Sequence, residues 1–161
     1  MRITEGDEAT VAFLEGLAAN DAVTYENNNA IVEAVARGEV EVGLVNHYYY
    51  QLEKEEGSPV AVVYPDQDAG EVGVLVNVSA ASIVEGASHL ENAQAFMKFL
   101  LGAEAQTLFA ETNFEYPLIA GAAETRAEVK RGSFRESEVS LAELGRMNDA
   151  TLDLLDEIAL E

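Results

Sequence analysis

The side chains best suited to chemistry are concentrated in residues 43–50, which have the sequence GLVNHYYY. Three consecutive tyrosines after an apolar segment place several phenol oxygens at one point of the chain. A phenolate is a hard oxygen donor, and hard, highly charged cations such as Fe3+ prefer oxygen donors. The run therefore indicates metal capture. The alternative is that Tyr48 and Tyr49 are an aromatic pair packed on a sheet.

The elements that must position this run alternate between strands and helices. Period-two or β-branched segments predict strands, and apolar residues at helical spacing predict helices. The predicted strands are 22–25, 40–44, 60–64 and 71–78, and the predicted helices are 7–19, 27–37, 48–56, 90–101, 104–112 and 141–160. Gly102 is predicted to separate two of the helices. The early strand–helix alternation indicates an α/β fold with a βαβ sheet.

Polar clusters fall at two strand-to-helix junctions, Asn27-Asn28-Asn29 and Asn46-His47-Tyr48-Tyr49. In open α/β sheets such junctions surround the ligand, and helix N-termini favour an anion. We therefore predict one pocket in which phenolates hold a cation beside a small anion.

Each residue of these junctions also has a simpler interpretation. Asn27, Asn28 and Asn46 can be plain helix caps, with Asn28 and Asn46 the candidates for anion contact. His47 is more typical of a surface or hydrogen-bonding histidine than of a ligand. Tyr50 lies one step further round the helix and is predicted to pack.

Composition excludes several classes of function. The chain has 161 residues, enough for one domain, and a formal net charge of −21. Nine scattered Lys and Arg residues argue against nucleic acid as a partner. There is no cysteine, and only two histidines, neither in a recognised catalytic motif, so we predict that the chain is not an enzyme. Residues 1–8 lack the apolar region of a signal peptide, and no apolar run approaches the ~20 residues of a membrane span.

Beyond these patterns, the sequence resembles the periplasmic ferric-iron-binding proteins of bacterial ABC transporters, also called bacterial transferrins. The resemblance covers essentially the whole chain and rests on residues 25–35 (YENNNAIVEAV), 38–39, 43–49 (GLVNHYY), 65–70 (PDQDAG), 76–78, 104–106, 115–118 (EYPL) and 144–150 (LGRMNDA). It implies the C-terminal lobe of a type 2 periplasmic-binding-protein fold, with a mixed sheet flanked by helices. It also implies that Tyr48 and Tyr49 ligate Fe3+ and that Asn28 and Asn46 hold a synergistic anion, phosphate or carbonate.

The chain departs from that family in length. A full member has two lobes, and this sequence resembles only the second, so the first-lobe ligands have no counterpart. We expect a truncated half, a single partial domain over 1–161. Its second-lobe core would be 1–58 and 89–161, and 59–88 would run back into the absent lobe. Half a cleft is expected to bind iron weakly or not at all unless two chains pair as a homodimer through the exposed lobe surface.

The resulting prediction is an extracytoplasmic solute-binding component of an ABC importer, periplasmic or anchored at the cell surface, that serves a membrane permease. Two alternatives stay open. The same fold could bind an organic or oxyanion solute, or the chain could be a dimerising interaction module that binds no iron.

Overall fold

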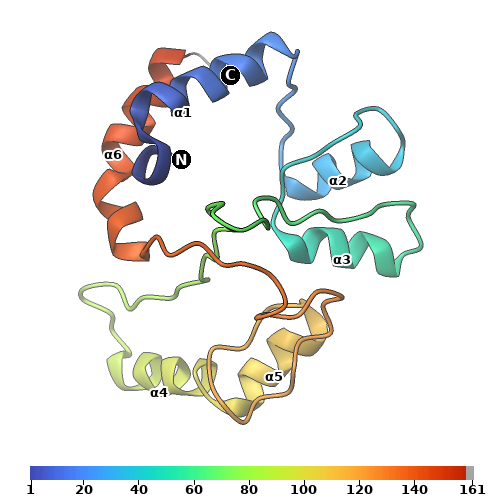
Figure 1. The fold of residues 1–161 in the computed structure, drawn as a ribbon. Helices are drawn as coiled ribbons and strands as arrows, with labels where there is room; N and C mark the ends of the chain where they lie inside the picture. The colour runs from blue at the N-terminus through green and yellow to red at the C-terminus, as the bar shows by residue number, and fades with distance from the viewer. Residues whose placement is uncertain (159–161) are drawn as a thin grey trace. The chain divides into compact units, whose positions relative to one another are not determined.

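Six helices joined by long irregular segments make up residues 1–158, the part of the chain that the computed structural model describes (Figure 1). The helices are α1 (Arg2–Ala19), α2 (Asn28–Ala36), α3 (His47–Glu55), α4 (Leu90–Leu100), α5 (Ala103–Thr112) and α6 (Leu141–Ile158). All six predicted helices are confirmed, although α1 begins five residues earlier than expected. The last two residues of the predicted helix 141–160 lie outside the described residues.

The predicted mixed sheet, and with it the expected architecture of a type 2 C-terminal lobe, is wrong for this structure. Within residues 1–158 no segment is a strand, and the β pairing consists of one isolated parallel bridge between Val74 and Glu136. Val42, Leu44 and Val63, from two of the predicted strands, are 77%, 73% and 84% exposed. Alternating valines make a segment suitable for a sheet, but a strand also needs a partner for its backbone N–H and C=O groups.

The chain divides into two compact units. The first combines Met1–Glu26, Tyr64–Asn77 and the segment from Arg135 onward, and the second combines Asn27–Val63 and Val78–Phe134. The apolar residues that are buried among residues 1–158 all belong to the second unit: Val32, Ala34, Tyr50, Ala105, Ala110, Phe114 and Ala127. The second unit therefore holds the core, as well as both polar junctions.

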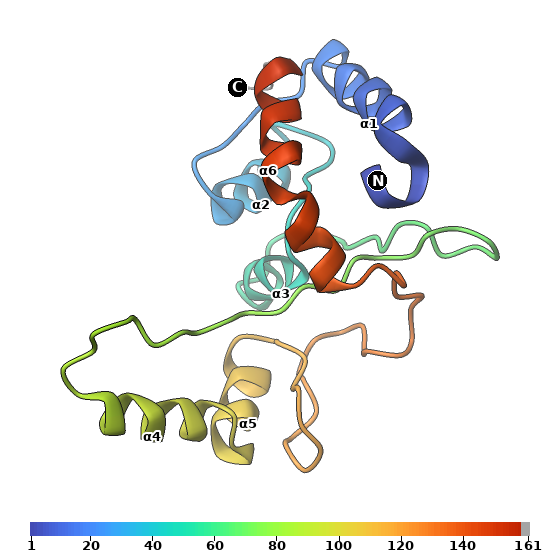
Figure 2. The same cartoon turned by 90° about the vertical axis from the view of Figure 1, so that its left-hand side faces the viewer.

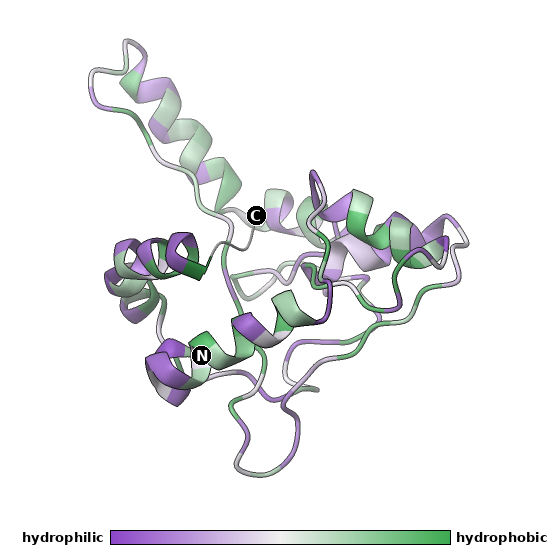
Figure 3. Cartoon of the chain, turned by 90° about the horizontal axis from the view of Figure 1, so that it is seen from above, coloured by the Kyte–Doolittle hydropathy of each residue, from purple (hydrophilic) through white to green (hydrophobic). Residues whose placement is uncertain are grey.

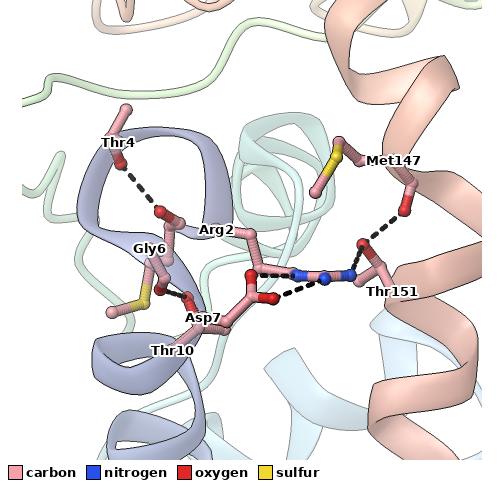
Figure 4. Close-up of polar contacts among 8 residues, drawn as sticks. Arg2, Thr4, Gly6, Asp7, Thr10, Met147 and Thr151 are labelled. Carbon is pink, nitrogen blue, oxygen red and sulfur yellow. Dashed lines mark hydrogen bonds and ion pairs between the residues drawn. The ribbon is translucent and has the colours of Figure 1, made fainter.

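In the first unit, α1 lies beside α6 (Figures 1 and 2). The guanidinium of Arg2 donates hydrogen bonds to both carboxylate oxygens of Asp7 at 2.8 and 2.9 Å, and to Thr151 Oγ1 of α6 at 3.1 Å (Figure 4). Its hydrogen bonds, and to a smaller extent its positive charge, lower the pKa of Asp7. α1 is kinked at Gly6, whose φ of 84° is open to glycine at little cost. The kink brings Asp7 to Arg2 within one helix.

In the second unit, α2 packs against α3, and α4 against α5 (Figure 1). Gly102 is the N-cap of α5 and separates it from α4, as predicted. Hydrophilic and hydrophobic residues mix along the helices (Figure 3), and large apolar side chains such as Phe96 and Leu108 stay exposed. No helix within residues 1–158 is long and apolar enough to cross a membrane.

Candidate functional site

Tyr48 and Tyr49 lie together in the first turn of α3. Their ring centroids are 4.4 Å apart, with an angle of 39° between the ring planes. Both side chains are half-buried. Asn46 is the N-cap of this helix, and its backbone carbonyl accepts a hydrogen bond from the Tyr49 N–H at 3.2 Å. The helix start thus presents two neighbouring phenols beside the positive end of a helix dipole.

The neighbours of Tyr48 favour the protonated form of its phenol. A hydrogen bond with Tyr49, burial and the negative charge of Glu115 raise the pKa of Tyr48 to about 12. A hydrogen bond with the Asn46 side chain acts in the opposite direction and lowers the pKa of Tyr48. The Asn46 amide therefore favours the phenolate form, which is the form that binds a metal ion.

His47 is held on the side of the site formed by residues 114–116. Its Nε2 lies 2.9 Å from the carbonyl oxygen of Phe114, and its ring stacks on that of Tyr116 with centroids 4.5 Å apart. Burial lowers the pKa of His47, so the ring is neutral at pH 7 and Nε2 carries the proton that it donates to Phe114. In this tautomer Nε2 has no lone pair for a metal ion, whereas Nδ1 keeps one. His47 also contacts the edge of the Tyr48 ring, at 5.7 Å between centroids, and so helps to orient it.

Tyr50 faces the interior of the second unit and is buried. Its hydroxyl donates a hydrogen bond to Glu128 Oε2 at 2.7 Å. Lys54 Nζ donates to the Tyr50 hydroxyl at 2.8 Å and to Glu128 Oε2 at 2.7 Å. Burial is the main cause that raises the pKa of Tyr50. With its hydroxyl engaged twice, Tyr50 anchors α3 and leaves Tyr48 and Tyr49 as the outward pair.

The asparagines of the two junctions have different roles. Asn27 is the N-cap of α2, and its Oδ1 accepts a hydrogen bond from the Ala30 N–H at 3.0 Å. Asn28 is the first helical residue and is half-buried. The Asn46 side chain makes no capping hydrogen bond in α3. Asn27 therefore has a structural role, while the amides of Asn28 and Asn46 are not used as caps.

Replacing Asn27 by alanine is expected to destabilise the second unit by about 1 kcal/mol, because the Ala30 N–H loses its acceptor. The matched control is Asn28→Ala, which removes no cap and should change the unfolding free energy by less than about 0.5 kcal/mol. Urea unfolding followed by far-UV circular dichroism measures both. Equal losses in the two variants would contradict the assignment of the cap.

An acidic cleft of about 260 Å³ lies between α2 and α3, and Tyr49 is part of its wall. Its lining residues are Asn29, Val32, Glu33, Tyr49, Leu52, Glu53 and Glu56. Three carboxylates beside the phenol create a negative potential that attracts cations. Sequence reasoning did not identify these glutamates, because their convergence depends on how two helices pack.

The segment Phe114-Glu115-Tyr116 is a second part of the site to which sequence reasoning gave no role. It supports His47 and places the Glu115 charge near Tyr48. The sequence signal for this segment was the EYPL motif at 115–118, which contributed to the family resemblance but not to the predicted site. Within residues 1–158 no group of three or more His, Cys, Asp or Glu residues is arranged to hold a metal ion.

Comparisons with known proteins agree on one family. The profile of the family described as bacterial extracellular solute-binding protein matches residues 4–133. The chain is 34% identical to Iron uptake protein A1 of Synechocystis sp., over 89% of this chain and 42% of that protein. It is 33% identical to Iron uptake protein A2 of the same organism, over 95% of this chain and 47% of that protein.

A third relative is the Fe(3+)-binding periplasmic protein of Serratia marcescens, 28% identical over 97% of this chain and 46% of that protein. The chain therefore spans less than half the length of each of these three relatives.

Proposed function

The chain belongs to the family of bacterial extracellular solute-binding proteins, and we propose that its solute is ferric iron, bound by the phenolates of Tyr48 and Tyr49. The observation that carries the proposal is the contact of these two phenols in the first turn of α3, at 4.4 Å between ring centroids. The names of the three relatives, two iron uptake proteins and one Fe(3+)-binding periplasmic protein, support the choice of iron.

Binding requires both phenols to lose their protons to solvent. The hydrogen bond between Tyr48 and Tyr49 would be replaced by a bond from each phenolate oxygen to the same cation. The positive charge of the cation offsets the repulsion between the two phenolates. The Asn46 amide and the start of α3 stabilise the negative oxygen, and the carboxylates of the α2–α3 cleft raise the local concentration of cations.

A small anion would complete part of the coordination sphere. Two phenolates fill only two of the positions around a hard cation that takes about six oxygen ligands. The Asn28 and Asn46 amides, together with free backbone N–H groups at the helix starts, provide donors for phosphate or carbonate. The remaining ligands are expected from parts of a longer protein or from solvent.

In the whole protein, this site would serve an extracytoplasmic importer component that delivers Fe3+ to an ABC permease. Family membership and the periplasmic relative support that placement.

Titration of the chain with ferric citrate tests the proposal. A visible phenolate-to-iron charge-transfer band should grow and saturate at one iron per chain, and phosphate should strengthen it. Calorimetry with phosphate alone is the companion measurement. If no visible band appears and phosphate binds without iron, the iron proposal is wrong and the site is one for an oxyanion.

The affinity for Fe3+ is expected to rise with pH. Because the pKa of Tyr48 is raised to about 12, this phenol is protonated at neutral pH and must release a proton to bind. Each released proton increases the apparent affinity by up to tenfold per pH unit, so two phenols give up to about 100-fold. Competition against citrate at pH 6.5, 7.5 and 8.5, corrected for the free Fe3+ activity, measures the slope. Tyr48→Phe should halve the slope of the logarithm of the affinity against pH. An affinity that does not depend on pH would contradict phenolate ligation.

A further inference from the structure

His47 connects the tyrosine pair to the segment that follows α5. Its ring meets the edge of the Tyr48 ring at 82°, with 5.7 Å between the centroids. It also stacks on the Tyr116 ring at 16°, with 4.5 Å between the centroids. Edge-to-face and stacked arrangements at about 4.5–7 Å are those that aromatic pairs prefer. The three rings therefore form a continuous row with His47 in the middle.

Tyr116 is itself held by groups that lie outside the tyrosine pair. Its hydroxyl donates a hydrogen bond to the carbonyl oxygen of Val129 at 2.7 Å, and its ring lies 6.0 Å from that of Phe134. A change of the Tyr116 rotamer would break this hydrogen bond together with the stack on His47. The surface on which the His47 ring rests is therefore fixed by the segment after α5.

The backbone of the same segment holds His47 at a second point. The carbonyl oxygen of Phe114 lies 2.9 Å from His47 Nε2. Phe114 is 2% exposed and has φ of 59°, a left-handed conformation that is common for glycine after a helix and unfavourable for a bulky residue. Such conformations persist where the surrounding structure fixes them, and they gather at functional sites. The hydrogen bond and the stack together fix the position and the tilt of the His47 ring.

We propose that Tyr116 is a positioning residue for iron binding, which fixes the His47 ring and through it the direction of the Tyr48 phenol. The inference rests on the function proposed above, in which Tyr48 and Tyr49 ligate Fe3+. Two neighbouring phenolates bind one cation tightly when their oxygens are held at a fixed separation, and residues behind the ligands supply that constraint. Tyr116 contacts a neighbour of the ligands and acts on the affinity and geometry of the site.

Replacing Tyr116 by leucine removes the stacked ring and is expected to weaken Fe3+ binding about tenfold and to shift the charge-transfer band. Tyr116→Phe keeps the ring, so it should bind Fe3+ more tightly than Tyr116→Leu and show the band at the wild-type position. Phe99→Leu is the matched control, because it removes an exposed ring of α4 in the same unit. It should change neither the band nor the affinity in the ferric citrate titration.

A double-variant cycle tests whether Tyr116 acts through His47. His47→Leu interrupts the row of rings at its middle and should also weaken binding and shift the band. Because the effect of Tyr116 passes through His47, the variant His47→Leu/Tyr116→Leu should lose no more affinity than His47→Leu alone. Losses that add in the double variant would overturn the proposed route.

A measurement without iron distinguishes the positioning role from the proposed function. Nuclear Overhauser effects between the ring protons of His47 and Tyr48 should be strong in the wild type and in Tyr116→Phe, and weak in Tyr116→Leu. Circular dichroism confirms that each variant is folded. Unchanged Overhauser effects, or wild-type affinity and band position, in folded Tyr116→Leu would overturn the positioning role and leave the iron site intact. A wild type without the band would instead overturn the iron site, and with it the role of Tyr116 in iron binding.

Discussion

The double substitution Tyr48→Phe/Tyr49→Phe is expected to abolish the visible charge-transfer band and to weaken Fe3+ binding by at least about 100-fold. Loss of a supporting outer-shell partner already costs a metal site 10–100-fold, and this change removes two direct ligands. The measurement is the ferric citrate titration, with the band and the affinity recorded together. Both aromatic rings are retained, so the 4.4 Å ring contact and the packing of α3 should persist.

Tyr25→Phe is the matched control for this prediction. It removes one phenol outside the candidate site and should leave the band and the affinity unchanged. Each single variant, Tyr48→Phe or Tyr49→Phe, should retain a weaker band, shifted because one phenolate remains. A band of full intensity in the double variant would exclude these two residues as ligands while leaving family membership intact.

The second large effect concerns stability and lies in the first unit. Gly73→Ala is expected to lower the free energy of unfolding by about 2–5 kcal/mol. Gly73 has φ of 80°, a left-handed conformation that costs other residues about 1–2 kcal/mol. An added Cβ would also lie 2.9 Å from the carbonyl oxygen of Arg135 and 3.0 Å from the carbonyl carbon of Glu136, which costs a further ~1–3 kcal/mol.

This collision falls on the β bridge of the first unit. Val74 N–H donates to the Arg135 carbonyl at 3.0 Å, and Ser137 N–H donates to the Val74 carbonyl at 2.9 Å. Gly70→Ala separates the two causes, because Gly70 has φ of 94° but no atom within 4 Å of an added Cβ. It should cost only about 1–2 kcal/mol, the conformational part. Urea unfolding measures both, and equal losses would show that the close approach to Arg135 and Glu136 contributes nothing.

The helices could be predicted because their signals are local. Asn27 and Gly102 lie at helix ends where the sequence placed candidate caps and a break, and α4 follows the apolar spacing of residues 90–101. The strands could not be predicted in the same way. The segment 40–44 has the alternation of a half-buried strand, yet it pairs with nothing in the described chain, and Val42 and Leu44 stay exposed.

The candidate site also combines features that are local in sequence with features that depend on the tertiary structure. The tyrosine pair, the helix that carries it and the asparagine before it follow from residues adjacent in sequence, and family membership follows from motifs spread along the chain. Which groups surround that pair was decided by tertiary structure: Phe114 holds His47 from 67 residues away, and Glu128 holds Tyr50 from 78 residues away.

The sequence alone therefore determined the family, the six helices and the residues proposed to bind iron. The tertiary structure was needed to show that the expected sheet is absent from residues 1–158, that His47 is hydrogen-bonded to Phe114, and that Tyr50 is hydrogen-bonded to Glu128. The difference comes from how far apart in sequence the interacting groups lie. Helix hydrogen bonds and caps join residues within about four positions, which a sequence pattern records directly. Sheet pairing, ion pairs and cavities join groups far apart in the chain, and depend on which surfaces meet when it folds.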